Sequence, residues 1–276
     1  NLSYIVAAIL FIFGIKMLGK ADTAKRGNLL SAVGMLLAVI VTLLSKGLSY
    51  PLIIGGLALG GAVGFVAAKR VQMTGMPELV ALFNGFGGLA SLLVGLAEYY
   101  RAKISNNLLE SVLIEELSSF TATVIVLTIL IGGITFTGSI YAWGKLSGKL
   151  GGHALTFTGQ KTFNALLALG IIAAGILFSS SPATELAHVV LITVLILSLL
   201  LGILAVMPIG GGDMPVVIAL LNSFSGLAAS SAGFAIGHLL LIVAGLLVGA
   251  SGIILTIIMC KAMNRRLTHV LFGGFG

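Results

Sequence analysis

The twenty residues Ala187–Val206, AHVVLITVLILSLLLGILAV, contain no Asp, Glu, Lys or Arg. A helix needs about 20 largely apolar residues to cross the hydrocarbon core of a bilayer. Lipid offers no hydrogen-bond partners, so a spanning segment must satisfy its own backbone groups, as a helix does. This stretch therefore predicts a transmembrane helix, and similar stretches recur along the whole chain.

Eight further apolar runs predict eight more spans. They lie at about Leu2–Leu18, Gly27–Leu44, Pro51–Ala68, Pro77–Ala97, Phe120–Trp143, Thr162–Phe178, Pro215–Ile236 and Leu239–Met259. The apolar and acidic positions of Asn107–Phe120 suit a short helix lying on the outer surface of the membrane. The expected fold is all-α, a polytopic membrane protein of about nine helices.

The composition excludes a soluble domain, because 58% of the 276 residues are hydrophobic and only 8% are charged. A soluble domain carries roughly a quarter of its residues as Asp, Glu, Lys or Arg. The solvent is therefore membrane lipid, and the net charge of +7 does not indicate nucleic acid as a partner. The single cysteine, Cys260, excludes an intrachain disulfide and belongs to no metal motif.

Lysine and arginine are divided unequally between the two sides of this layout. One set of connections holds 12 of them and the other only 3, namely Lys46, Arg101 and Lys103. Cytoplasmic loops carry the excess of positive charge in membrane proteins. The pattern predicts an outside N-terminus and a cytoplasmic C-terminus, as an odd number of spans requires.

An internal repeat organises the spans. Met76–Gly95 (MPELVALFNGFGGLASLLVG) and Met214–Gly233 (MPVVIALLNSFSGLAASSAG) are identical at 10 of 20 positions. Four spans are duplicated, and an even number of spans makes the repeat parallel. We interpret the chain, 1–276, as a single transmembrane domain. Its parts are repeat A at about 1–98, repeat B at about 119–236, a final helix at about 239–262 and a C-terminal connection, 263–276.

Each copy of the repeated helix presents one face of small and polar residues. In the first copy these are Pro77, Ala81, Asn84, Gly88, Ser91 and Gly95, and in the second Pro215, Ala219, Asn222, Gly226, Ser230 and Gly233. Small residues let helices approach closely in lipid. We therefore interpret Gly88 and Gly226 as helix-packing positions.

The two asparagines differ from their small neighbours, because an amide needs partners that lipid does not offer. Asn84 and Asn222 each lie seven residues beyond the proline that opens the helix, or about 10 Å at helical rise. Two readings stay open. The amides line a polar seam that faces a neighbour or trapped water, or they only bond helices together.

Other glycines form ridges at a spacing of four residues. Gly56, Gly60 and Gly64 form one ridge, and Gly245 and Gly249 form another. Each ridge predicts a helix-packing surface. The first is not a dinucleotide loop, because it lies within an apolar span with no preceding soluble strand.

Two carboxylates stand where the repeated helices begin. Glu78 and Asp213 suit the positive end of a helix dipole. Alternatively, they sense protons or contact a soluble domain. No histidine pair has metal-ligand spacing, and we expect no metal site.

Several longer stretches carry a family resemblance. They are RGNLL (Arg26–Leu30), MPELVALFNGFGGLAS (Met76–Ser91), GGGDMPVVIALLNSFSGLAASSAGF (Gly210–Phe234), VGASGIIL (Val248–Leu255), IMCKAMNR (Ile258–Arg265) and GGFG (Gly273–Gly276). Together they closely resemble the membrane part of the beta subunit of proton-translocating NAD(P)+ transhydrogenase, over nearly the whole chain.

The resemblance implies a function. In this family the membrane domain couples inward proton flow to hydride transfer from NADH to NADP+, which separate soluble domains perform. The implied partners are membrane lipid, the transmembrane helices of the alpha subunit and the NAD(H)- and NADP(H)-binding domains, in a dimer of the full assembly in the bacterial inner membrane. This stretch alone is expected to bind no cofactor, to hold no catalytic residue and to transfer no hydride, because the NADP(H) domain follows it in the intact subunit.

The resemblance also implies roles for individual residues. Asn84 and Asn222, with Ser91 and Ser230 on the same faces, fall on the proton path. Asp213, Ser251 and Gly252 match positions tied to coupling, as we expect also for Glu78. Lys261, Arg265 and Arg266 begin the connection to the nucleotide domain.

One departure from the family concerns Asn84, where many relatives carry histidine. An amide does not titrate near neutral pH, so the protonatable group comes from elsewhere, and a helix of the alpha subunit is one source. Two other classes stay open: a secondary transporter with a central site between parallel repeats, and a passive membrane anchor. A substrate-sized cavity and activity without soluble partners would favour the transporter.

Overall fold

The computed structural model describes residues 2–44, 49–108, 117–182 and 184–272, and these residues form helices joined by short connections, with no strand among them. They divide into two compact units, which meet in sequence at Met73 and Thr74. Eight of the described helices are long and apolar enough to span a membrane. The ninth apolar helix has 17 residues. The prediction of an all-α, polytopic membrane fold is confirmed.

The first unit holds α1 (Leu2–Leu18), α2 (Ala21–Leu43) and α3 (Tyr50–Arg70). Helices α1 and α2 form a tight hairpin, because small residues face each other across it. A Cβ atom added to Gly14 would lie 2.9 Å from the carbonyl oxygen of Gly27. The glycines therefore allow the two backbones to touch.

Helix α3 buries none of its residues. The ridge of Gly56, Gly60 and Gly64 lies along it, and no described atom lies within 4 Å of a Cβ added at any of the three. The predicted packing surface thus has no neighbour among the described residues. Large apolar side chains such as Leu59 and Val63 are also exposed on α3.

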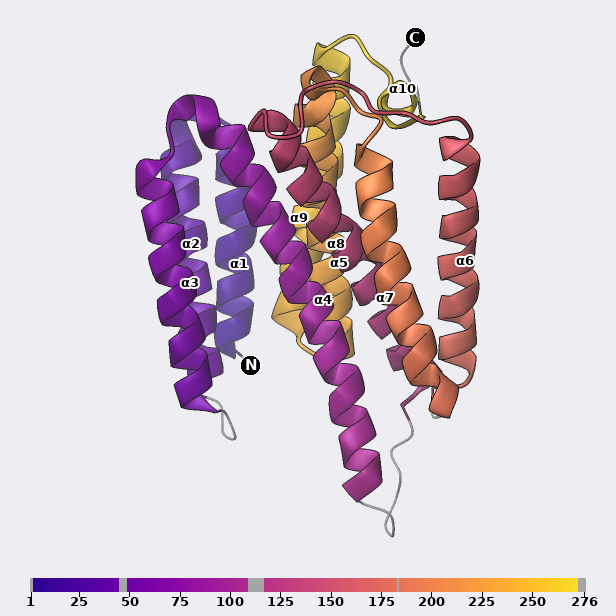
Figure 1. Cartoon of the computed structure of the whole chain (residues 1–276). Coiled ribbons are helices and arrows are strands. Elements are labelled where there is room, and N and C mark those ends of the chain that lie inside the picture. The colour runs from indigo at the N-terminus through magenta and orange to yellow at the C-terminus, as the bar shows by residue number, and fades with distance from the viewer. Residues whose placement is uncertain (1, 45–48, 109–116, 183, 273–276) are drawn as a thin grey trace. The chain divides into compact units, whose positions relative to one another are not determined.

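Within its described residues, the second unit holds seven α-helices. They are α4 (Met76–Leu108), α5 (Ser119–Leu146), α6 (Gln160–Ser180), α7 (Glu185–Val206), α8 (Met214–Ala235), α9 (Leu239–Ala262) and α10 (Leu267–Phe272). Helix α5 is central and contacts α4, α6, α7 and α8, whereas α9 packs on α8 (Figure 1). Half of α5 is buried inside the protein.

Successive long helices of this unit run in opposite directions (Figure 1). The N-termini of α4, α6 and α8 and the C-termini of α5, α7 and α9 therefore share one end. We call it the Asp213 end, after the residue that precedes α8. The other end is called the opposite end.

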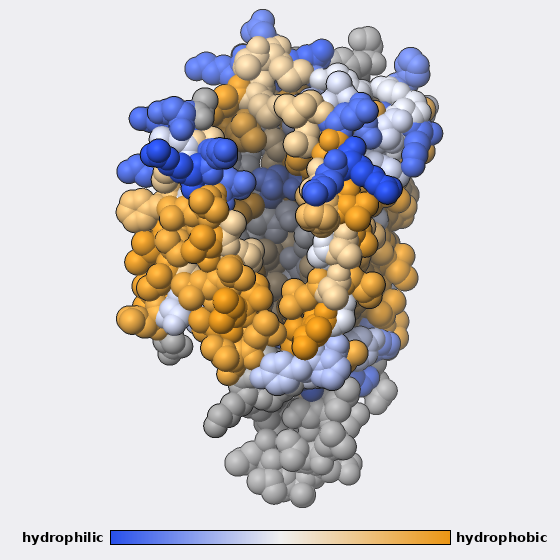
Figure 2. Space-filling view, turned by 90° about the vertical axis from the view of Figure 1, so that its left-hand side faces the viewer, coloured by the Kyte–Doolittle hydropathy of each residue, from blue (hydrophilic) through white to orange (hydrophobic). Residues whose placement is uncertain are grey.

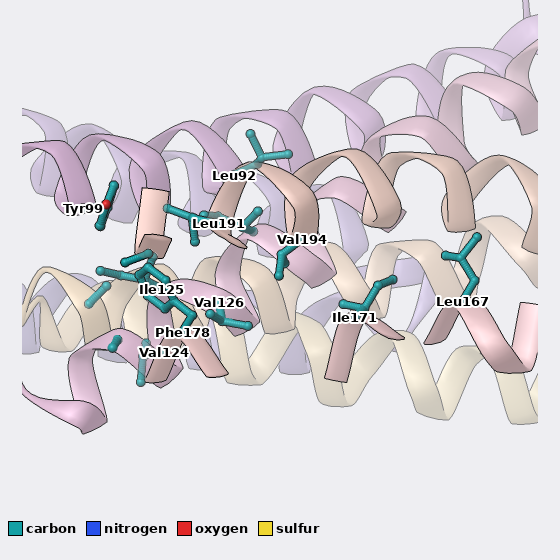
Figure 3. Close-up of a cluster of buried hydrophobic side chains, with 14 residues drawn as sticks. Leu92, Tyr99, Val124, Ile125, Val126, Leu167, Ile171, Phe178, Leu191 and Val194 are labelled. Atoms are coloured by element: carbon teal, nitrogen blue, oxygen red, sulfur yellow. The ribbon is translucent and has the colours of Figure 1, made fainter. Parts of the chain in front are cut away.

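The hydrophobic core of this unit forms two clusters. The larger joins α4, α5, α6 and α7 and includes Ile125, Phe178 and Leu191 (Figure 3). The second lies at the Asp213 end, where Met214 and Val270 are fully buried. Val270 belongs to α10, so the chain beyond α9 is anchored on this cluster.

Most predicted helix bounds agree with the structure to within a few residues, but three regions differ. Helix α2 begins at Ala21, six residues before the predicted start at Gly27. Helix α4 continues 11 residues past the predicted end at Ala97 and reaches Leu108. The surface helix predicted over Asn107–Phe120 is not seen where the structure describes this stretch: residues 107 and 108 belong to α4, and α5 begins at Ser119. Residues 109–116 of that prediction lie outside the described residues.

The exposed surface is largely apolar, as a membrane-embedded protein requires. In Figure 2 hydrophobic residues cover most of the visible flank. Helix α4 illustrates the pattern, since Phe83, Phe86 and Leu93 are exposed while Asn84 and Ser91 are buried. Its polar face points inward and its apolar face outward, the reverse of a helix on a soluble protein.

Candidate functional site

Asn84 joins two helices. Its side chain is 7% exposed, and Nδ2 donates a hydrogen bond to the carbonyl oxygen of Ile218 at 3.2 Å. Ile218 lies on α8, one turn before Asn222, so the amide of the first repeat reaches the equivalent helix of the second. Of the two readings left open by the sequence, bonding between helices is the one that the Asn84 contact displays.

Asn222 is not the mirror of Asn84. It is half-buried, and its side chain makes no hydrogen bond to another residue of the described chain. The duplicated position therefore gives one amide that holds two helices and a second amide with its hydrogen-bonding capacity still open. The contacts differ although the sequence repeat places both amides at one depth.

Ser91 and Ser230 are both buried, with 6% and 3% exposure. The hydroxyl of Ser91 donates to the carbonyl oxygen of Gly87, one turn earlier on the same helix. Ser230 lies where α8 and α9 touch, because a Cβ atom added to Gly245 would lie 2.5 Å from its backbone nitrogen. Ser230 is thus placed in a helix–helix contact, whereas the hydrogen bond of Ser91 stays within α4.

A polar stripe on α5 was missed by the sequence reasoning. Thr128, Thr135 and Ser139 are fully buried on it. The two threonines donate to carbonyl oxygens one turn earlier, whereas the Ser139 hydroxyl has no hydrogen-bond partner among the described residues. The repeat of hydroxyl residues at spacings of seven and four was visible in the sequence.

The α5 stripe faces glycines of α4. A Cβ atom added to Gly85 would lie 3.2 Å from the Cβ of Ser139, and one added to Gly88 would lie 2.8 Å from the Gly132 oxygen and from the Cβ of Thr135. Farther along, a Cβ atom added to Gly95 would lie 3.2 Å from Cγ2 of Thr128. We call this antiparallel contact the α4–α5 seam. Gly88 belongs to it, since the three atoms nearest to its added Cβ are all on α5.

Glycines also set the contact between α8 and α9. A Cβ atom on Gly226 would lie 2.3 Å from the nitrogen of Gly249 and 2.7 Å from the oxygen of Gly245. The Ser223 hydroxyl donates to the Gly249 oxygen at 2.6 Å. The structure therefore places these three glycines in one helix–helix contact.

Ser251 and Gly252 lie within the same contact and not beside Asp213. A Cβ atom on Gly252 would lie 2.7 Å from the nitrogen of Ser223, and the Ser251 hydroxyl donates to Val248. Gly252 is ten residues before the end of α9, or about 15 Å at helical rise. It stands at the level of Asn222, so the structure does not join these two residues to the other coupling candidates.

Asp213 is paired at its own end. Its side chain is 7% exposed, and its Oδ2 lies 3.7 Å from Nη1 of Arg265. Asn264 adopts the left-handed conformation, with φ at 53°, and the Arg265 nitrogen bonds back to the Cys260 oxygen at 2.8 Å. Asparagine tolerates this conformation at a helix C-terminus, and the turn that it makes brings Arg265 to Asp213.

The remaining charged candidates for coupling are more exposed to solvent than Asp213. Glu78 is half-buried in the first turn of α4, and Lys261 and Arg266 are exposed. They share the Asp213 end but make no ion pair with one another where the structure describes them.

Lys145 was missed by the sequence reasoning, which counted it only among the cations of a connection. It is 3% exposed. Its Nζ donates to the carbonyl oxygens of Met207 and Ile209, at 2.6 and 2.7 Å. These carbonyls follow the end of α7, so the ammonium group ties α5 to the segment that leads to Asp213. Only the tertiary contacts separate it from the exposed Lys149.

These features together define a class of protein. Polar side chains are buried where apolar helices meet, and no group of metal-ligating residues occurs in the described part of the chain. The fold and the site are those of a multi-pass membrane protein with a polar interior.

The comparisons narrow the class to a family. The family model described as NAD(P) transhydrogenase beta subunit matches residues 1–276. NAD(P) transhydrogenase subunit beta of Rhodospirillum rubrum is 42% identical over 279 residues, which cover 99% of this chain and 58% of the relative. The subunit of that name from a specified strain of the species matches to the same extent. The chain therefore belongs to the NAD(P) transhydrogenase beta subunit family, and it spans somewhat more than half of the length of these relatives.

Proposed function

We propose that this chain is the proton-translocating membrane part of an NAD(P)+ transhydrogenase. In the assembled enzyme, inward proton flow through the membrane part drives hydride transfer from NADH to NADP+ in separate soluble domains. The observation that carries the proposal is family membership over residues 1–276, in a fold whose polar side chains face inward. Family membership does not favour the alternative, a secondary transporter.

The proposed proton path uses the polar groups of α4 and α8. Asn222 has open hydrogen-bonding capacity, and Asn84, Ser91 and Ser230 are buried within the apolar unit. Buried polar groups in membrane helices are costly and mark ion and proton routes. Water that bridges these groups would complete the path.

The proposed coupling site is the Asp213 end. The Asp213–Arg265 pair links the start of α8 to the chain beyond α9, which we propose leads to the NADP(H) domain. Lys261, Arg266 and Glu78 are the open charges that such a domain would contact. Ser251 and Gly252 would act one step deeper, by setting how α9 packs at the level of Asn222.

The partners and the location follow from the same proposal. The transmembrane helices of the alpha subunit, the two nucleotide-binding domains and a second copy of the assembly complete the enzyme in the bacterial inner membrane. NAD(H) and NADP(H) would bind to the soluble domains and not to residues of this chain. Its N-terminus would lie outside and its C-terminus in the cytoplasm.

The test is the intact enzyme in proteoliposomes, with hydride transfer and internal pH recorded together. We expect each hydride transferred to NADP+ to be accompanied by proton movement, and a protonophore to abolish the pH change. Hydride transfer without any proton movement would overturn the proposal.

The path is tested with Asn222→Leu in the same enzyme. Leucine has a similar volume, so packing should survive, but the open amide is lost. We expect assembly on gel filtration to match wild type and the coupled rate to fall about tenfold or more, since intramembrane polar groups are retained for function. Leu241→Met, a volume-conserving change on the neighbouring helix, is the control. A normal coupled rate in a well-assembled Asn222→Leu enzyme would remove Asn222 from the path.

A further inference from the structure

The polar face of α4 continues beyond the residues assigned above and ends in a carboxylate. Asn84, Ser91 and Glu98 follow one another at intervals of seven residues, which return to the same face of a helix. All three are buried, at 7%, 6% and 9% exposure. The face thus carries a polar group on every second turn, over about 21 Å of helix.

The α4–α5 seam runs beside this face on the same helix, because the α4 residues that meet α5 are Gly85, Gly88 and Gly95, whereas Asn84 bonds to α8. From the Asp213 end it passes Ser139, then Thr135 and then Thr128, which stands against Gly95. Glu98 lies one turn beyond Gly95 on α4, where the seam approaches the opposite end. Hydroxyl groups therefore stand on the facing helix along the way between the amide and the carboxylate.

Glu98 connects this buried face to the surface through one cation. Its carboxylate accepts hydrogen bonds from Nε and Nη2 of Arg101, at 3.0 and 2.5 Å. The Arg101 side chain is 75% exposed, whereas that of Glu98 is 10% exposed. One member of the pair thus reaches the surface and the other faces the interior.

Other titratable side chains stand at this end of the unit. Tyr100 and His188 are hydrogen-bonded to each other at 3.3 Å, and Tyr99 stacks against the same imidazole. His238 begins α9. The first turns of α5, which lie at the same end of the unit, supply serine and threonine and no charged side chain.

We propose that Glu98 is the proton-accepting group at the opposite end of the α4–α5 seam. The inference rests on the proposed function and supplies, from this chain itself, a titratable group in line with Asn84. A proton from water binds one carboxylate oxygen, and the neutral acid then loosens its contact with Arg101. The same proton later leaves that oxygen for the hydroxyl groups and bridging water of the seam, which restores the carboxylate and its pair.

The test uses the intact enzyme in proteoliposomes, with the pH varied on the side that faces Glu98. Glu98→Gln keeps the shape of the side chain but cannot exchange a proton. We expect its coupled rate to fall by about 100-fold, the lower end of what a positioned proton-transfer group contributes, and to lose its dependence on the pH of that side. Lys103→Gln removes an exposed charge from the same helix and should behave as wild type.

A second variant and a spectroscopic measurement separate this role from a structural one. Glu98→Asp keeps a carboxylate, so we expect part of the coupled rate to return with a shifted pH profile. A carboxyl stretch that changes with pH in wild-type infrared difference spectra should be lost in Glu98→Gln. If Glu98→Gln fails to assemble, an unshifted pH profile in Glu98→Asp would overturn the inference.

The outcomes distinguish this inference from the proposed function. Wild-type hydride transfer with no proton movement would overturn the function, whatever Glu98 does. Proton movement in wild type together with an unchanged rate and pH profile in an assembled Glu98→Gln enzyme would overturn only the role of Glu98.

Discussion

At the scale of single residues, glycine decides how closely the helices approach. Gly245 lies where a Cβ atom would stand 2.5 Å from the Ser230 nitrogen and 2.6 Å from the Gly226 oxygen. Backbone atoms cannot turn aside as a flexible side chain does. A single added methyl group would therefore have to push α8 and α9 apart. Gly170 on α6 offers a contrast, because no described atom lies within 4 Å of the added Cβ.

We predict that Gly245→Ala destabilises the protein whereas Gly170→Ala does not. Overpacking a tight contact costs about 1–3 kcal/mol, while alanine at an open helical position is favoured over glycine by about 1 kcal/mol. Thermal melting in detergent should show a lower melting temperature for Gly245→Ala only. Equal melting of the two variants would remove the claim that α8 and α9 touch at this glycine.

At the scale of elements, a buried lysine holds together the parts of the Asp213 end. Lys145 closes the last turn of α5 and donates to two carbonyls that follow α7. The same segment is bonded to the loop after α5, because the Gly211 nitrogen donates to the Gly152 oxygen at 2.9 Å. Asp213 ends this segment and directly precedes α8. Lys145 is thus a positioning residue for Asp213.

We predict that Lys145→Met lowers both stability and the coupled rate. Hydrogen bonds to a charged group contribute about 1.5–3 kcal/mol each, and methionine has none to offer. Lys149→Met is the matched control, since Lys149 is exposed and lies only over the Trp143 ring, at 4.3 Å. Melting temperature and coupled proton movement should change in the first variant and stay near wild type in the second.

A conservative variant sharpens this prediction. Lys145→Arg keeps the charge and the donors, so it should recover part of both losses. Wild-type behaviour of Lys145→Met would show that the two carbonyls find other partners and that Asp213 does not depend on this lysine.

At the scale of the whole molecule, charge is distributed along the direction in which the helices run. Lys145, Lys149, Lys161, Lys261, Arg265 and Arg266 all belong to the Asp213 end of the second unit. Arg101 and Lys103 belong to the opposite end. Cations accumulate on the cytoplasmic side of membrane proteins, so this distribution supports a cytoplasmic Asp213 end.

We predict opposite sidedness for two engineered thiols in a Cys260→Ser background. Asp22→Cys, at the start of α2, should react with an impermeant reagent from the cytoplasmic side only. Lys103→Cys, near the end of α4, should react from the outside only. Labelling of both positions from one side would overturn the orientation.

The sequence determined the fold class, because a long apolar run has one stable structure in lipid and its length fixes where the helix can lie. It also placed the two asparagines at equal depth, since both copies of the repeat have the amide seven residues beyond the proline. The sequence did not predict that α4 continues to Leu108, because polar residues at a membrane surface do not by themselves end a helix. The stretch before Asn107 is as compatible with continued helix as with a turn.

Only the tertiary structure decided what each residue touches. The two copies of the repeat have different neighbours, so Asn84 bonds to α8 while the Asn222 amide stays open. Lys145 and Lys149 look alike in sequence, yet Lys145 is buried and donates to two carbonyl oxygens, whereas Lys149 is exposed. The Glu98 position could have been read from the spacing of 84, 91 and 98, but its burial could not. Burial depends on which helix packs against that face, and the local sequence of a helix does not determine which helices pack against it.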